Sequence, residues 1–319
     1  MDRTRAAVRV EPSSPTSVAV ALETVTNSSS RLQLVDHPAT GFPQFHVPRE
    51  FNAYLDEPLA QRPAGSSGKR GQCAFAFHVR QGRTYLQRSF VSHPFHFTHP
   101  WHLDPALPDM AVVYVQTPAG GLIQGDQVAM HFTLESSARV HITTQAAEKI
   151  HTMTANCAIQ HISFEVAAGA YAEYCPEPVI LFPRSRFAQE LHVELGAHAW
   201  FFCSELFLVP ERMALFEAFA NSLTVRETTG RLLLHERGLA LPRQWNLDGP
   251  AILAGQRVWG QAVFIGPQIS TGIVKDLAAL IADQPGVTCG ATSLPRERGI
   301  AVKVLGAQVP AVRRVLQTA

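Results

Sequence analysis

Short runs in which apolar and polar residues alternate fill the chain from about residue 71 onward. The run MAVVYVQT at residues 110–117 is rich in β-branched residues, and a PAGG turn follows it. Many such runs are separated by Gly or Pro at intervals of about 8–12 residues, which is typical of strands joined by turns. We expect further strands at residues 74–80, 84–87, 128–134, 139–144, 159–166, 171–174, 179–182, 187–195, 199–207, 223–228 and 231–237. Because no helices intervene, the pattern predicts a mainly β fold of short, mostly antiparallel strands.

Helical periodicity is confined to the C-terminal part of the chain. In residues 273–283 the apolar side chains fall on one stripe of a helix, and the Pro-Gly pair at 285–286 ends it. Residues 310–316 predict a second helix with proline in its first turn. Residues 300–305 have the pattern of a strand between the two. We therefore expect two helices near the C-terminus.

Residues 1–70 differ in composition from the rest of the chain. They contain seven prolines, a run of three serines and a Gly-Ser-Ser-Gly segment. Proline removes a backbone donor, and a segment rich in proline and serine buries little apolar surface. We predict a flexible or loosely packed extension at residues 1–70, followed by a single β domain at residues 71–319.

Composition narrows the class of protein further. Lys plus Arg is 27 and Asp plus Glu is 26, so the net charge of +1 gives no preference for nucleic acid. No apolar run approaches the roughly 20 residues that cross a bilayer, so we expect no membrane association. The 5 cysteines form no Cys-x-x-Cys pair, and no signal-peptide pattern opens the chain. We therefore expect a cytoplasmic protein without a disulfide framework.

The segment GGLIQGD at residues 120–126 has the glycine spacing of a phosphate-binding loop. Such a loop needs a lysine after its last glycine and then a helix, because the lysine and the free N–H groups of the helix hold the phosphate. Here Asp126 occupies the lysine position, and a strand-like run follows. The segment therefore disfavours nucleotide binding. Its simplest role is a turn that Asp126 holds through hydrogen bonds to the backbone.

Several segments in series resemble the urease accessory protein D family (UreD, called UreH in some bacteria). The resembling segments are the glycine-rich one with Gly120, Gly121 and Gly125, TTQAAEKI with Thr144 and Lys149, AYAEYCPEP at 170–178, GVTCGAT at 286–292 and VKVLG at 302–306. The resemblance covers about residues 73–319, and the segments follow one another in the expected order. The resemblance implies an open β-superhelix.

The resemblance also implies a function without catalysis. Members of the family help to assemble the nickel metallocentre of apo-urease in complex with accessory protein F and the GTPase accessory protein G. No tightly bound cofactor is implied, and nickel is handled transiently along an internal route lined by acidic residues. Asp126, Glu205 and Glu236 match acidic positions of the family. Carboxylates suit such a route because Ni²⁺ accepts them as ligands and a transfer path must also release the ion.

Histidines suggest a second kind of site. His93, His96, His99 and His102 recur every three residues. In a polyproline II segment they would line one edge as a weak metal site, whereas in a strand they would alternate between faces. Two other classes therefore stay open: a metal-dependent enzyme on a β scaffold that uses these histidines, and a protein-interaction domain without a metal role. The chain contains neither an H-E-x-x-H nor a G-x-S-x-G motif.

Overall fold

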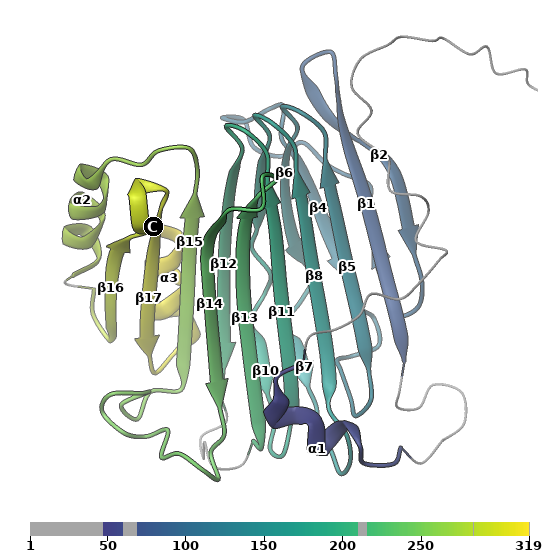
Figure 1. Ribbon diagram of the computed structural model, residues 1–319, viewed down its shortest axis with the longest axis vertical. Coiled ribbons are helices and arrows are strands. Elements are labelled where there is room, and N and C mark those ends of the chain that lie inside the picture. Colours follow the sequence, from purple (N-terminus) through teal and green to yellow (C-terminus); the bar gives the residue numbers. More distant parts are fainter. Residues whose placement is uncertain (1–46, 60–68, 210–215, 283, 319) are drawn as a thin grey trace, which may run out of the picture. The chain divides into compact units, whose positions relative to one another are not determined.

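Two β-sheets hold the strands of the structure, a computed structural model that describes residues 47–59, 69–209, 216–282 and 284–318 (Figure 1). These residues belong to one compact unit, Gly41–Ala319. The seven-stranded sheet contains, in spatial order, β14 (Leu232–Ala240), β13 (Ala218–Glu227), β11 (Arg186–Leu195), β8 (Ala158–Val166), β5 (Gln127–Leu134), β1 (Arg70–Arg80) and β2 (Arg83–Val91). The ten-stranded sheet contains β16 (Val287–Ser293), β17 (Gly299–Gly306), β15 (Val258–Ile265), β12 (Trp200–Leu208), β9 (Tyr171–Tyr174), β6 (Arg139–Thr144), β4 (Ala111–Gln116) and β3 (His96–Phe97), with β10 (Val179–Leu181) beside β12 and β7 (Glu148–Ile150) beside β10.

From β4 to β13 the chain passes repeatedly from one sheet to the other, with β6 and β7, and β9 and β10, consecutive in the ten-stranded sheet, so the chain winds as a β-solenoid. Each strand of the series β5, β8, β11 and β13 pairs in parallel with its counterpart in the next turn. The predicted mainly β superhelix is therefore confirmed. The prediction of mostly antiparallel strands is wrong for the middle of both sheets, because hydrogen-bonded neighbours there lie one turn apart in the chain. Antiparallel pairs occur toward the ends of the sheets, as at β1–β2, β13–β14 and β15–β17.

The parallel register stacks similar side chains in the core between the sheets. Phe75, Phe132 and Phe164 occupy one register row across β1, β5 and β8. The rings of Phe132 and Phe164 are stacked with centroids 4.7 Å apart, and Phe201 of the facing sheet lies 5.3 Å from Phe164. Because successive side chains of a strand point to opposite faces, the residues beside these rings face away from the core. Each sheet therefore has an inner and an outer face.

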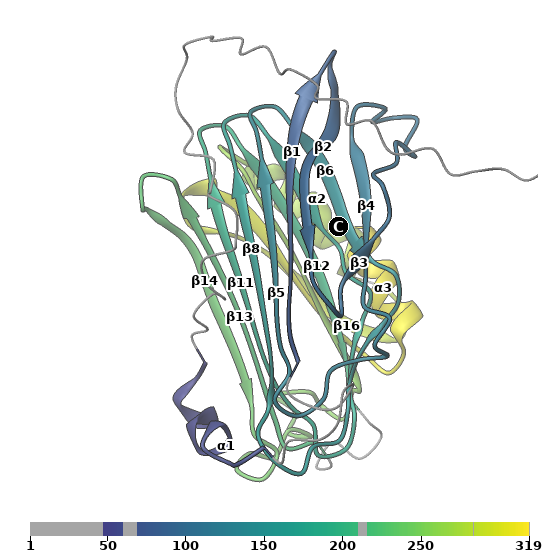
Figure 2. The ribbon, with the colours of Figure 1, turned by 90° about the vertical axis from the view of Figure 1, so that its right-hand side faces the viewer.

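Both predicted C-terminal helices are present, as α2 (Thr271–Ala282) and α3 (Val309–Thr318). The α3 helix buries Val312, Val315 and Leu316 against the outer face of the ten-stranded sheet (Figure 2). A Cβ at Gly260 of β15 would come within 2.7 Å of Leu316 Cδ1, so glycine allows the helix to approach closely. No helix in the described part of the chain is long and apolar enough to cross a membrane.

A short N-terminal segment packs against the outer face of the seven-stranded sheet. It consists of a 3-10 turn at Arg49–Phe51 and the single-turn helix α1 (Asn52–Leu55). Phe51 is fully buried in a small cluster with Cys157 and Leu241. The predicted loose packing is therefore wrong for residues 47–59. Residues 1–46 and 60–68 of the predicted extension lie outside the described residues.

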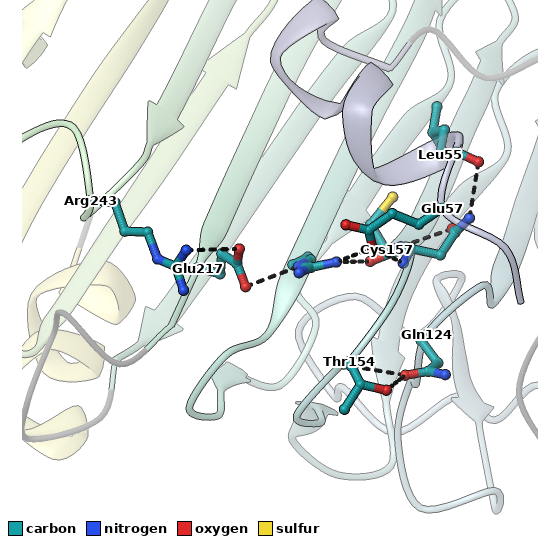
Figure 3. Close-up of polar contacts among 9 residues, drawn as sticks. Leu55, Glu57, Gln124, Thr154, Cys157, Glu217 and Arg243 are labelled. Atoms are coloured by element: carbon teal, nitrogen blue, oxygen red, sulfur yellow. Dashed lines mark hydrogen bonds and ion pairs between the residues drawn. The ribbon is translucent and has the colours of Figure 1, made fainter.

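Charged groups anchor this segment to the solenoid. Glu57, just after α1, pairs with Arg186 of β11 at 2.6 Å, and Arg186 also pairs with Glu217 at 3.0 Å. The Arg186 guanidinium lies 4.3 Å from the centre of the Tyr54 ring. Glu217 also pairs with Arg243 at 3.8 Å, and Figure 3 labels Glu57, Glu217 and Arg243. Because the Arg186 side chain is only 9% exposed, its charge depends on these acidic partners.

Candidate functional site

Polar side chains interrupt the apolar core between the two sheets. We call them the interior polar cluster, and its residues are Glu148, Gln160, Gln189, Glu205, Asn221 and Gln261. All but Glu148 are at most 8% exposed. The cluster follows from strand register, because Gln160, Gln189 and Asn221 are neighbours across β8, β11 and β13, while Glu205 and Gln261 are neighbours across β12 and β15.

Glu205 lies at the centre of the cluster and is 2% exposed. Its carboxylate accepts hydrogen bonds from the amides of Gln189 and Asn221 on the facing sheet and from Gln261 at 2.7 Å on its own sheet. Burial raises the pKa of Glu205, and the hydrogen bonds from the three amides and the charge of Lys303 act in the opposite direction. A buried carboxylate whose hydrogen-bond partners are neutral amides is costly to keep charged, and a passing cation would stabilise it.

Glu148 is the second acid of the cluster. Thr117 donates a hydrogen bond to its Oε2 at 3.2 Å, while its Oε1 is buried and has no hydrogen-bond partner among the described residues. Burial and the nearby charge of Asp126 raise the pKa of Glu148 from 4.5 to about 7, against the opposing effects of Thr117 and Lys69. Near neutral pH this group therefore exchanges a proton readily, and it can give up that proton when a cation binds.

A small cavity joins the two acids. Glu148, Gln160, Gln189 and Glu205 all line it, and its volume is about 20 Å³. A cavity of this size holds about one water molecule, and its polar walls supply the partners that such a water needs. The interior therefore places two carboxylates around a space that a single water can occupy.

Glu236 lies where the cluster approaches solvent. It sits on β14 and forms a short ion pair with Lys303 of β17, which also donates to Gln261 Oε1 at 2.5 Å. The Glu236 side chain is 32% exposed and that of Lys303 is 51% exposed. A chain of contacts therefore runs from the exposed Glu236 through Lys303 and Gln261 to the buried Glu205. The structure thus brings together two of the three predicted acids, Glu205 and Glu236.

Asp126 lies apart from this chain of contacts and has the partners of a structural residue. It is fully buried and accepts hydrogen bonds from the backbone N–H groups of Lys69 at 2.9 Å and Ile123 at 3.0 Å. The Lys69 ammonium pairs with it at 3.1 Å. The turn function predicted for Asp126 is therefore confirmed, and strand β5 follows the glycine-rich segment as expected. Asp126 affects the cluster through its charge, which raises the pKa of Glu148.

The glycine-rich and threonine-rich segments contact each other. Gly120, Gly121 and Gly125 all have positive φ angles, and a Cβ at Gly121 would lie 2.2 Å from the carbonyl oxygen of Lys149. These positions therefore require glycine. The Lys149 side chain is exposed, whereas Thr144 lines the interior cavity and accepts a hydrogen bond from the N–H of Glu177.

The four histidines of residues 93–102 do not form a ligand cluster. His96 belongs to the two-residue strand β3 (His96–Phe97), and the other three histidines lie outside the named strands. His102 Nε2 lies 3.0 Å from the carbonyl oxygen of Thr84. Groups of three potential ligand atoms do occur in the described residues at His141, Glu173 and Cys175 and at His161, Glu190 and His192, and none of these four histidines takes part.

The sequence analysis missed the three glutamines and the asparagine of the cluster. Each one occupies an inward position between two apolar inward residues, as Gln189 does between Phe187 and Leu191. Every second residue of these strands points inward, and the inward neighbours of each amide are apolar. A polar residue at such an inward position is the signal that could have identified the four amides. Glu148 is on a three-residue strand, where alternation is too short to assign a face.

The fold and the interior define a β-solenoid scaffold with an acidic, hydrogen-bonded core. A family model described as UreD urease accessory protein matches residues 69–319. Similar curated proteins include the urease accessory protein UreD of Cenarchaeum symbiosum, 31% identical over 81% of this chain and 93% of the relative, and that of Haloarcula marismortui, 31% identical over 84% and 91%. That of Photorhabdus laumondii is 28% identical over 83% of this chain and 84% of the relative. The chain belongs to the UreD family of urease accessory proteins, and its role lies in urease maturation.

Proposed function

We propose that the chain acts in urease maturation as a non-enzymatic scaffold through which Ni²⁺ passes to apo-urease. It works in the cytoplasm in complex with accessory protein F and the GTPase accessory protein G. Nickel is its cargo, and no cofactor is tightly bound. The acids of the interior polar cluster bind the ion transiently, and the exposed Glu236 lies at one opening of the path.

The observation that carries this proposal is the environment of Glu205. A fully buried carboxylate held by three neutral amides gains little for stability, because burial of a charge without a cationic partner is expensive. The same environment suits transfer of a cation. The carboxylate attracts Ni²⁺, and a single carboxylate with water as the other ligand is weak enough to release the ion.

Substitution of Glu236 distinguishes nickel transfer from assembly of the complex. Co-expression of the chain with urease subunits and accessory proteins F and G, followed by pull-down and measurement of nickel per urease, gives both readouts. We expect Glu236→Gln to reduce nickel incorporation while the complex still forms, because a neutral amide attracts the ion less. Glu194→Gln, an exposed glutamate on β11, is the matched control and should behave as the unsubstituted chain.

Asp126→Asn tests the remaining predicted acid. Asparagine keeps one acceptor for the turn but loses the ion pair with Lys69, so we expect a loss of stability of about 2 kcal/mol. If Asp126 also affects the path through Glu148, nickel incorporation falls even at a temperature where the variant is folded. Normal nickel incorporation with both Asp126→Asn and Glu236→Gln would leave the chain a role in assembly alone.

A further inference from the structure

Histidines gather on the outer face of the seven-stranded sheet, on the side away from the interior polar cluster. His161 of β8 and Glu190 of β11 are register partners, and His192 follows two residues after Glu190 on the same face. Two of these residues directly follow an inward residue of the cluster: Gln160 precedes His161, and Gln189 precedes Glu190. Strand alternation therefore places the two sets back to back across one sheet.

Glu190 lies between the two imidazoles. Its Oε2 is 3.4 Å from His161 Nδ1, and its Oε1 forms a short contact with His192 Nε2. The two rings lie side by side with centroids 5.4 Å apart. One nitrogen from each ring and a carboxylate oxygen all lie within 4.8 Å of one another. Three donor atoms of the types that bind transition metals thus converge from two adjacent strands.

The surroundings leave this group accessible. The His192 side chain is 38% exposed, and Glu190 also lines a groove of about 360 Å³ together with Ser222 and His235. His131 on β5 is near enough to His161 for their charges to interact, but its nitrogens contact the hydroxyls of Ser163 and Thr133. An ion from solvent can therefore reach the group without passing through the core.

We propose that His161, Glu190 and His192 form a surface site for a divalent transition-metal ion such as Ni²⁺ or Zn²⁺. Two imidazoles and one carboxylate are a common set of three protein ligands for these ions, with water in the remaining positions. The site is separate from the interior path, because it lies on the other face of the hydrogen-bonded strands β8 and β11. It therefore goes beyond the proposed transfer function and does not depend on it.

The other candidate group is less suited to a metal. His141 Nδ1 lies 2.5 Å from Glu173 Oε2, but the Tyr171 hydroxyl already donates to the second carboxylate oxygen. Burial raises the pKa of the Cys175 thiol to about 12, and the Glu173 charge adds to this effect. A protonated thiol is a poor ligand. The His161 group supplies two imidazoles instead and does not need a thiolate.

Metal titration of the full-length chain tests the site. Calorimetry with Ni²⁺ alone and with Zn²⁺ alone gives the number of bound ions, and X-ray absorption gives the number of imidazole ligands. We expect the double variant His161→Ala/His192→Ala to lose one bound ion or to bind it at least tenfold more weakly. His198→Gln, which alters an exposed histidine in the turn that follows β11, is the matched control and should keep that ion.

Two further variants keep the outcome decisive. If the double variant does not fold, His192→Gln alters a single, partly exposed ring and should give the same direction of change. Glu205→Gln removes an interior carboxylate and should leave the imidazole-bound ion in place. This variant therefore tests the interior path independently of the histidine site. Equal metal stoichiometry and affinity for the unsubstituted chain and the histidine variants would overturn the proposal, as would the absence of any imidazole-bound ion in the unsubstituted chain.

Discussion

Glu205 and Glu190 lie on opposite sides of strand β11 and have different environments. Glu205 reaches β11 from the facing sheet, is fully buried, and accepts hydrogen bonds from neutral amides that include Gln189. Glu190, the next residue after Gln189, lies on the outer face between His161 and His192. The first carboxylate has partners that cannot ionise, while the second has partners that can bind a metal themselves. One stretch of strand therefore supports two kinds of polar chemistry.

In the proposed function, this difference separates the transfer path from the outer surface. Amides hold the inner carboxylate in place without neutralising it, so it retains its attraction for a cation. Imidazoles on the outer face supply nitrogen donors of the type that transition metals bind. The hydrogen-bonded strands β8 and β11 lie between the two sets.

The largest expected loss of stability comes from the apolar part of the outer face, where the N-terminal segment packs. Phe51→Ala should lower the free energy of unfolding by about 3–5 kcal/mol, because Phe51 is fully buried against that face. Denaturant unfolding measures this loss. Ile273→Ala, at an exposed position on α2, is the control and should change stability by less than about 0.5 kcal/mol. A similarly small effect for Phe51→Ala would mean that the N-terminal segment is not docked.

The next effect is the pH dependence of stability that arises from Glu148 of the interior polar cluster. The pKa of Glu148 is about 7 in the folded chain, whereas the ordinary value of a glutamate is 4.5. Between pH 4.5 and pH 7 the folded state therefore keeps a proton that the unfolded state has lost. Stability should therefore fall as pH rises through this window, by about 3 kcal/mol in total. Glu148→Gln removes this contribution. The difference in unfolding free energy between the two proteins should change from pH 4.5 to 7, and a constant difference would contradict the assignment.

The smallest effect compares the two faces of β11 directly. Gln189→Leu leaves Glu205 without one of its donors and should cost about 1–3 kcal/mol. Glu194→Gln on the exposed outer face should change stability by less than about 0.5 kcal/mol. Thermal unfolding of both variants under identical conditions gives the comparison. Equal losses would show that the inner contacts do not hold Glu205 in place.

Local pattern accounts for the part of the fold that the sequence predicts. The strands expected at 128–134 and 159–166 appear as β5 and β8, because alternation is a property of a few adjacent residues. Their parallel pairing could not be predicted in the same way, since it depends on the closure of each solenoid turn. The segment around Phe51 was also missed, because neighbouring prolines obscure a short apolar cluster.

The candidate site was predictable only in part. Glu205 and Glu236 were identified through a family resemblance, and the structure connects them through Lys303. The glutamines were missed because glutamine is usually exposed, and only its phase within a buried strand indicates otherwise. His161 and His192 lie one solenoid turn apart in the chain, so register rather than spacing brings them together. The histidines of residues 93–102 show the reverse, because close spacing in sequence did not produce a cluster.

The central claim is that the buried carboxylate of Glu205 carries nickel toward urease. Its most direct test is the nickel content of urease purified after co-expression with the Glu205→Gln variant and the other accessory proteins. Glutamine preserves the shape of the side chain but removes its charge. We expect a complex that assembles normally and a urease with markedly less nickel, while Glu194→Gln gives the unsubstituted level. Full nickel loading by a folded Glu205→Gln chain would show that Glu205 does not transfer nickel.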